Sequence, residues 1–202
     1  MPAKRSAAAS DAIVQFADQQ AWADWLAAHH ATATGLWLRL AKKGSPEGTV
    51  SYAEALEIAL CYGWIDAQKR GESDHTWLQR FMPRTATSIW SKINREKALA
   101  LIAAGRMQPA GRREVERAQA DGRWEQAYDS PRTAEVPADL REALARNPAA
   151  QSFFGELSGA NRYAVLWRIQ TAKKPETRAK RVRDLVDMLA RRETIHPQKR
   201  DD

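Results

Sequence analysis

The residues best suited to chemistry lie between positions 63 and 94, where aromatic side chains are interspersed with aspartate and arginine. Trp64 and Asp66 are two residues apart, which places both side chains on one face of a strand. A carboxylate beside an indole is partly desolvated and needs a cationic or N–H partner. Arg80 and Arg84 are the nearest candidates, because a guanidinium holds a carboxylate through two parallel hydrogen bonds. This pattern predicts either a pocket for a small polar or anionic ligand or a structural Asp–Arg pair.

A second polar group follows at the start of a predicted helix. The N–H groups of a helix N-terminus bind anions, so Ser88, Trp90 and Asn94 could extend the same pocket. An N-cap role explains Ser88 equally well. The predicted ligand-binding set is therefore Trp64, Asp66, Arg80, Arg84, Ser88, Trp90 and Asn94.

Signatures of catalysis and of cofactor binding are absent from the sequence. There is no G-x-S-x-G element and no phosphate-binding glycine loop. The single cysteine, Cys61, excludes an internal disulfide and a cysteine-based zinc site. His29 and His30 are adjacent, and on a helix they point about 100° apart, which is unsuited to a shared metal. We therefore expect no cofactor and no metal, and a binding protein rather than an enzyme. The alternative is a hydrolase or transferase that uses Asp66 as acid or base.

The positive charge is concentrated near the end of the chain. The net charge is +7, and residues 161–202 contribute +6, from 12 Lys and Arg against 6 Asp and Glu. Arg178 and Arg181 lie on neighbouring turns of a predicted basic helix, so nucleic-acid binding through this helix is a second alternative. A solvated or internally paired face is the favoured interpretation, because the sequence signatures of nucleic-acid-binding folds are missing. No leader-like segment and no long apolar run is found, and we expect a cytoplasmic protein without membrane insertion.

The elements that must position these residues form an α+β pattern. Ser51 and Glu54 make a capping box before a helix that ends at Gly63. Residues 36–40, 64–68 and 75–81 have the composition of strands. We expect a small antiparallel sheet of about three strands packed with helices, followed by a helical C-terminal lobe. One core is expected between the sheet and the capped helix, formed by Trp37, Tyr52, Leu56, Leu60, Trp64 and Trp77.

The expected organisation has four parts. A disordered tail covers residues 1–10, and an α+β lobe with the site covers residues 11–106. A helical lobe covers residues 107–194, and a second disordered tail covers residues 195–202.

Several blocks of the chain resemble the YdeI/OmpD-associated family, also called bacteriocin-protection proteins. The blocks are residues 52–66 (YAEALEIALCYGWID), 80–84 (RFMPR), 88–94 (SIWSKIN), 105–111 (GRMQPAG), 121–124 (DGRW) and 172–178 (AKKPETR). The resemblance implies a small cytoplasmic bacterial protein linked to tolerance of bacteriocins and cationic antimicrobial peptides, with a functional link to an outer-membrane porin. The resemblance identifies no catalytic residues in this chain. The expected partner is a small ligand or a protein bound at the predicted set.

Overall fold

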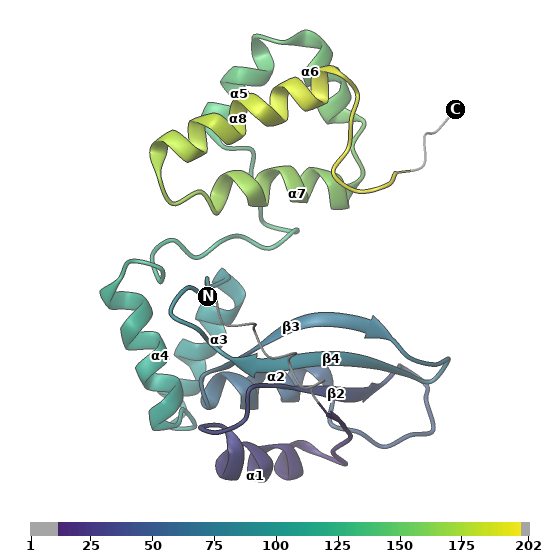
Figure 1. Ribbon diagram of the computed structural model, residues 1–202, viewed down its shortest axis with the longest axis vertical. Coiled ribbons are helices and arrows are strands. Elements are labelled where there is room, and N and C mark those ends of the chain that lie inside the picture. Colours follow the sequence, from purple (N-terminus) through teal and green to yellow (C-terminus); the bar gives the residue numbers. More distant parts are fainter. Residues whose placement is uncertain (1–11, 199–202) are drawn as a thin grey trace, which may run out of the picture. The chain divides into compact units, whose positions relative to one another are not determined.

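The computed structural model describes residues 12–198, which form two compact units. The first unit comprises residues 12–89 and 94–125, and the second comprises residues 90–93 and 126–198. The first contains a sheet and helices, whereas the second is helical (Figure 1). The predicted boundary at residue 106 differs from this division, because residues 94–125 belong with the sheet. The tail predicted over residues 1–10 lies outside the described residues.

A four-stranded sheet of order β1-β2-β4-β3 forms the centre of the first unit. Its strands are β1 (Ile13–Val14), β2 (Leu36–Ala41), β3 (Trp64–Gly71) and β4 (Thr76–Pro83). β1 runs parallel to β2, and the other neighbouring pairs are antiparallel. The α+β class is confirmed, but the sheet has four strands rather than three. β1 is only two residues long, so it leaves no periodic pattern in the sequence.

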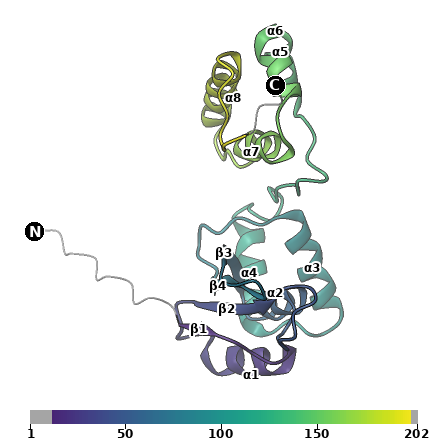
Figure 2. The same cartoon turned by 90° about the vertical axis from the view of Figure 1, so that its right-hand side faces the viewer.

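Four helices accompany this sheet: α1 (Gln19–His29), α2 (Tyr52–Cys61), α3 (Lys92–Ala103) and α4 (Pro109–Ala120). The predicted capping box at the start of α2 is present, with Ser51 and Glu54 each bonding the other's backbone N–H. The Trp22 indole of α1 donates to the carbonyl of Ala55 on α2 at 3.0 Å, which ties these two helices together. Figure 2 shows the ribbons of α1 and α2 within the first unit. Alternation along β2 directs Leu36, Leu38 and Leu40 into the core.

Three aromatic residues predicted for this core lie at its margin. Trp37 alternates with the buried leucines of β2, and the Arg70 guanidinium covers its ring at 4.9 Å. Tyr52 is 38% exposed and Trp77 is half-buried. The prediction that they join the core is wrong, because Trp22, Trp64 and Phe81 fill that volume instead.

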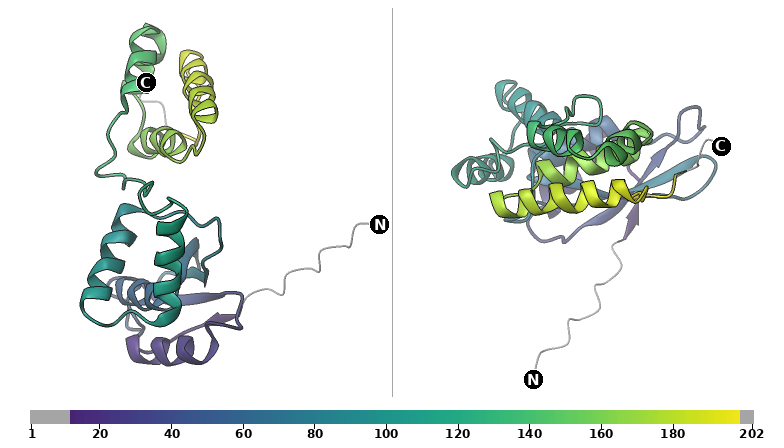
Figure 3. Two further views of the ribbon diagram at one scale, coloured as in Figure 1. Left: turned by 90° about the vertical axis from the view of Figure 1, so that its left-hand side faces the viewer. Right: turned by 90° about the horizontal axis from the view of Figure 1, so that it is seen from above.

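The second unit packs α5 (Ala138–Ala145), α6 (Pro148–Gly155), α7 (Gly159–Gln170) and α8 (Pro175–Ala190) around an apolar core (Figure 3). Asn147 caps the N-terminus of α6, since its side chain accepts from the Ala150 N–H at 3.1 Å. The helical C-terminal part is thus confirmed. Among the described helices, none has the length and apolar composition needed to cross a bilayer.

The basic face of α8 is partly engaged inside the second unit. The Arg178 guanidinium donates to both carboxylate oxygens of Asp139, at 2.7 and 2.9 Å, and to the carbonyl of Ile169. Arg181 donates to the carbonyl of Arg168 at 2.5 Å. Two arginines that could contact phosphates therefore close the end of α7 and join α5 to α8.

The ion pair between Arg178 and Asp139 predicts a contribution to stability that is lost in acid. Hydrogen bonding to Arg178 lowers the pKa of Asp139, so the contribution is present above the carboxyl's unfolded value of about 4 and is lost as pH falls through the folded value. Because 41% of the Asp139 side chain is exposed, solvent screening limits the effect to about 1 kcal/mol. Asp139→Asn should lower the free energy of unfolding by about that amount at pH 7. Urea titrations should show the gap closing below about pH 3; a constant gap would contradict the assignment.

Candidate functional site

Trp64 and Asp66, the first members of the predicted set, have different environments on the same face of β3. Trp64 is 1% exposed, its indole donates to the carbonyl of His30 at 3.2 Å, and its ring packs edge-on against Trp22 and Trp25. Trp64 is therefore a core residue. Asp66 lies nearer the surface and accepts a hydrogen bond from the Tyr52 hydroxyl at 2.9 Å.

The sheet register separates Asp66 from Arg80. Asp66 pairs with Phe81, and Arg80 pairs with Trp37. Neighbouring residues of a strand point to opposite faces, so Arg80 lies on the face away from Asp66. The register could not be read from the sequence, because it depends on the turn and on an irregularity of β3 between Asp66 and Lys69.

Arg84 is buried at the end of β4 and belongs to a cluster of charges. It is 5% exposed, and its guanidinium donates to the carbonyl of Ile89 at 3.3 Å. Glu114 of α4 lies close enough for Arg84 to lower the pKa of its carboxyl, although burial has the larger effect and the net shift is upward. Arg117 forms an ion pair with Glu114. We call Arg84, Glu114, Arg117 and Arg123 the arginine cluster.

Arg123 joins this cluster to Ser88. It is 5% exposed, pairs with Asp121 at 2.7 Å, and donates to the carbonyl of Ser88 at 2.6 Å. Glu114, Arg117 and Arg123 are not among the residues predicted from the sequence, although Arg123 stands in one of the quoted blocks. The arginines of the arginine cluster bind backbone carbonyls and carboxylates of their own unit, which is the arrangement of a structural brace.

The remaining members of the predicted set are divided between the units. Asn94 is buried in the first turn of α3. Trp90 is buried in the second unit, and its carbonyl accepts from the N–H of Tyr128 at 3.0 Å. Arg84 and Ser88 thus lie at one cluster, whereas Asp66, Arg80 and Trp90 lie elsewhere.

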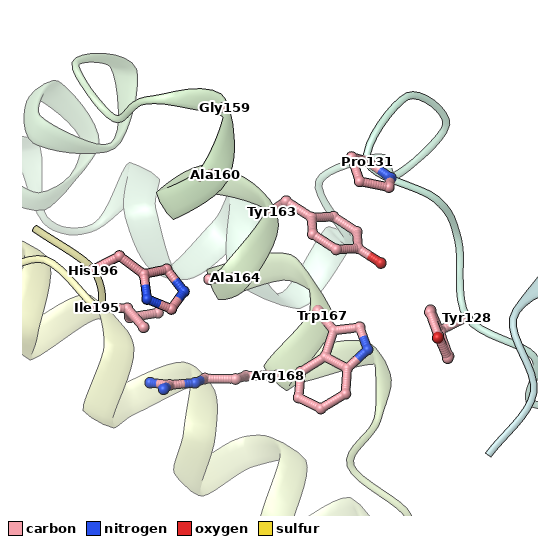
Figure 4. Close-up of a pocket in the computed structure, with 10 residues that line it drawn as sticks. All are labelled: Tyr128, Pro131, Gly159, Ala160, Tyr163, Ala164, Trp167, Arg168, Ile195 and His196. Atoms are coloured by element: carbon pink, nitrogen blue, oxygen red, sulfur yellow. The ribbon is translucent and has the colours of Figure 1, made fainter. Parts of the chain in front are cut away.

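The second unit contains a groove of about 620 Å³ along α7, which Figure 4 shows. The residues of α7 that line the groove are three or four positions apart, so their side chains share one face of the helix. Small residues create the hollow, and aromatic and basic residues surround it. The lining residues are Tyr128, Pro131, Gly159, Ala160, Tyr163, Ala164, Trp167, Arg168, Ile195 and His196. We call this cavity the α7 groove.

Hydrogen bonds from Asn161 hold the segment that carries His196 against α7. The Asn161 amide donates to the carbonyl of His196 at 3.1 Å and accepts from its N–H at 2.9 Å. The same amide and the N–H of Ser158 both donate to the side-chain oxygen of Gln198. Ile195 and His196, which belong to the tail predicted over residues 195–202, therefore line one side of the groove.

Asp129 organises the opposite wall. Its carboxylate pairs with Lys92 at 2.6 Å and accepts from Gln170 at 3.0 Å. Its carbonyl accepts from the Tyr163 hydroxyl at 2.9 Å, which fixes that ring. Burial, with smaller effects from Tyr128 and Asp129, raises the pKa of Tyr163 to about 12, so this phenol stays protonated.

The groove combines aromatic faces with uncommitted N–H donors. Tyr128 and Trp167 meet edge to face at 6.2 Å, and Trp167 is 36% exposed. Within residues 12–198, neither the Arg168 guanidinium nor the His196 ring makes a hydrogen bond or ion pair, and both line the groove. Among residues 12–198, those that line the groove include no carboxylate. Such a groove suits a flat or apolar molecule that carries an acceptor or anionic group.

The fold defines an α+β protein made of a sheet-containing unit and a helical unit. Residues 14–114 match the family model described as a domain of unknown function (DUF8412); this match covers half of the chain, and the chain belongs to that family. Residues 133–192 match the model described as Bacteriocin-protection, YdeI or OmpD-Associated. Searches of curated proteins and of solved structures find no match.

The resemblance to the YdeI/OmpD-associated family is confirmed over residues 133–192, a narrower range than the quoted blocks suggested. Four of those blocks, from residue 52 to residue 111, fall inside the DUF8412 match. The α7 groove, by contrast, takes most of its lining from α7, within the YdeI/OmpD-associated match.

Proposed function

We propose that this protein is a cytoplasmic tolerance protein that acts by binding a small anionic ligand in the α7 groove. The observation that carries the proposal is the groove itself, in the unit that matches the bacteriocin-protection family. Its volume of about 620 Å³ and its aromatic lining with a few polar groups are typical of small-molecule sites.

The lining also indicates the chemistry of the ligand. Tyr128, Tyr163 and Trp167 offer ring faces and edges to a flat or apolar body. Arg168 and His196 offer N–H donors to an anionic end, and a guanidinium binds carboxylate or phosphate with two hydrogen bonds. The groove thus favours an aromatic or apolar acid.

This charge bears on how tolerance would arise. A cationic peptide would meet the Arg168 guanidinium without a carboxylate in the lining to offset it, and like charges disfavour association. We therefore propose that tolerance depends on an anionic cellular ligand rather than on direct capture of the peptide. Within the described part of the chain, the lining holds no carboxylate, thiol or serine hydroxyl, which favours binding over hydrolysis.

The test uses anilinonaphthalene sulfonate, an aromatic anion that fluoresces in apolar sites, as the probe. Arg168→Gln should weaken its binding about tenfold, because one charged hydrogen-bonding partner is lost. Ala164→Leu should abolish binding by filling the groove. Arg162→Gln is the matched control, since Arg162 is on α7 but lies over Phe154 at 4.5 Å and does not line the groove.

Thermal unfolding checks that each variant remains folded, and peptide challenge of cells then connects the groove to tolerance. A strain carrying Ala164→Leu should lose the tolerance that the parent and Arg162→Gln retain. Unchanged dye affinity in Ala164→Leu would reject the groove as a binding site. If Ala164→Leu lost dye binding but kept full tolerance, the groove would have no part in tolerance.

A further inference from the structure

A second binding feature lies in the first unit, at the corner formed by Tyr52, Asp66 and Trp77. The Tyr52 hydroxyl donates to the Asp66 carboxylate at 2.9 Å. The rings of Tyr52 and Trp77 are 5.8 Å apart and inclined at 49°. The Lys69 ammonium stands 4.3 Å from the centre of the Trp77 ring. The corner therefore joins a carboxylate to two aromatic rings, and a positive charge already lies over one of these rings.

An irregularity in β3 puts Lys69 there. In a regular strand, residues three apart point to opposite faces, so Asp66 and Lys69 would be separated by the sheet. The ladder shifts between them, with Asp66 opposite Phe81 and Lys69 opposite Gln79. The extra residue brings both side chains to the same face, as a β-bulge does.

The bulge is held by a buried side chain. Gln79 is 4% exposed, and its amide donates to the carbonyls of Ala67 and Gln68 at 3.3 and 3.0 Å. These are the residues that bulge out of the ladder. Holding the bulge therefore uses a buried polar side chain, and bulges commonly re-aim a side chain near a binding site.

We propose that Tyr52, Asp66 and Trp77 form a site for an organic ammonium group, which Lys69 occupies when no ligand is bound. Aromatic faces attract ammonium groups through their quadrupole, and a nearby carboxylate adds charge complementarity. The Lys69 side chain is exposed and flexible, so an incoming ammonium displaces it without changing the sheet. This site is separate from the α7 groove and prefers the opposite charge.

The ammonium could belong to a small quaternary amine or to a lysine side chain of a peptide. Choline and a trilysine amide represent these two sources. Dimethylbutanol, which has the shape of choline without its charge, is the matched probe. Binding is followed by the NMR signal of the Trp77 indole N–H, which is assigned by its loss in Trp77→Phe.

Lys69→Gln is the decisive variant, because removing the internal occupant should strengthen binding. Choline should bind about two- to fivefold tighter to Lys69→Gln than to the parent protein. Trp77→Leu and Asp66→Asn should each weaken binding several-fold, and dimethylbutanol should bind more weakly than choline throughout. A preference for trilysine over choline would assign the site to peptide side chains, and the reverse preference would assign it to small amines.

The proposal is overturned if Lys69→Gln leaves the affinity for both ammonium probes unchanged. It is also overturned if dimethylbutanol binds as tightly as choline, because the charge would then play no part. Lys69 is exposed, so its replacement leaves the fold intact and keeps the result interpretable. Anilinonaphthalene sulfonate binding should be the same in Lys69→Gln and the parent, which separates this test from that of the α7 groove.

Discussion

Arg84→Ala is expected to lower the free energy of unfolding by about 1–3 kcal/mol at neutral pH, the cost of leaving buried hydrogen-bonding groups without their partner. Arg84 is 5% exposed, donates to the carbonyl of Ile89, and lies beside the half-buried Glu114. Removing Arg84 takes a hydrogen-bond donor from the Ile89 carbonyl and a nearby positive charge from the Glu114 carboxylate. Urea denaturation of the variant and of the parent measures this loss.

The pH dependence tests the mechanism of this loss. Arg84 lowers the pKa of Glu114 against the upward effect of burial, so its removal should raise that pKa further. A raised folded pKa favours the protonated native state, and the deficit of Arg84→Ala should shrink as pH falls from 7 towards 5.

Arg113→Ala is the control for Arg84→Ala, because Arg113 is an exposed arginine next to Glu114 on α4. The free energy of unfolding of Arg113→Ala should stay within about 0.5 kcal/mol of the parent's value. If Arg84→Ala instead kept its stability, the arginine cluster would not be a brace. Ligand recognition by Arg84, which the sequence suggested, would then regain support.

Gly111→Ala is expected to cost about 3 kcal/mol or more, as overpacking against a rigid backbone does. A Cβ added at Gly111 would stand 2.4 Å from the carbonyl oxygen of Cys61 and 2.7 Å from that of Leu60. Neither atom can move without shifting the end of α2. The gain of about 1 kcal/mol from replacing a helical glycine is too small to offset this clash. Calorimetric melting would detect the loss directly.

Gly155→Ala provides the matched comparison at the end of α6. A Cβ at Gly155 would meet no atom within 4 Å. The substitution should leave the melting temperature unchanged or raise it slightly, because alanine loses less backbone entropy. Equal melting temperatures for the Gly111 and Gly155 variants would mean that α4 does not approach α2 closely.

Local signals in the sequence predicted much of the fold. The capping box at Ser51, the glycine at position 63 with its positive φ of 74°, and the Asn147 cap all depend on neighbouring residues only. The packing of α4 on α2 depends on Gly111 meeting carbonyls some 50 positions earlier, as the residue numbers show. No local pattern encodes such a contact, so the assignment of residues 94–125 to the first unit could not be read from the sequence.

The candidate site was harder to predict, because it depends on register and on contacts between distant segments. Asp66 and Arg80 are close in the hairpin, but pairing of Asp66 with Phe81 puts them on opposite faces. The α7 groove joins Tyr128, Trp167 and His196, which come from three separate segments. The sequence showed only that residues of these types were present.

Residues 90–93 make the second unit discontinuous along the chain. Ser91 forms a parallel bridge with Tyr128, and the N–H of Lys92 donates to the carbonyl of Tyr128. A fragment cut at the edge of the family match, residue 133, would therefore lose Tyr128 and its supporting segment together. Residues 94–125 thus interrupt the sequence of the helical unit and belong to the sheet-containing unit. The family match and the compact helical unit therefore have different ends, and a fragment of residues 133–192 would lack Tyr128 from the lining of the groove.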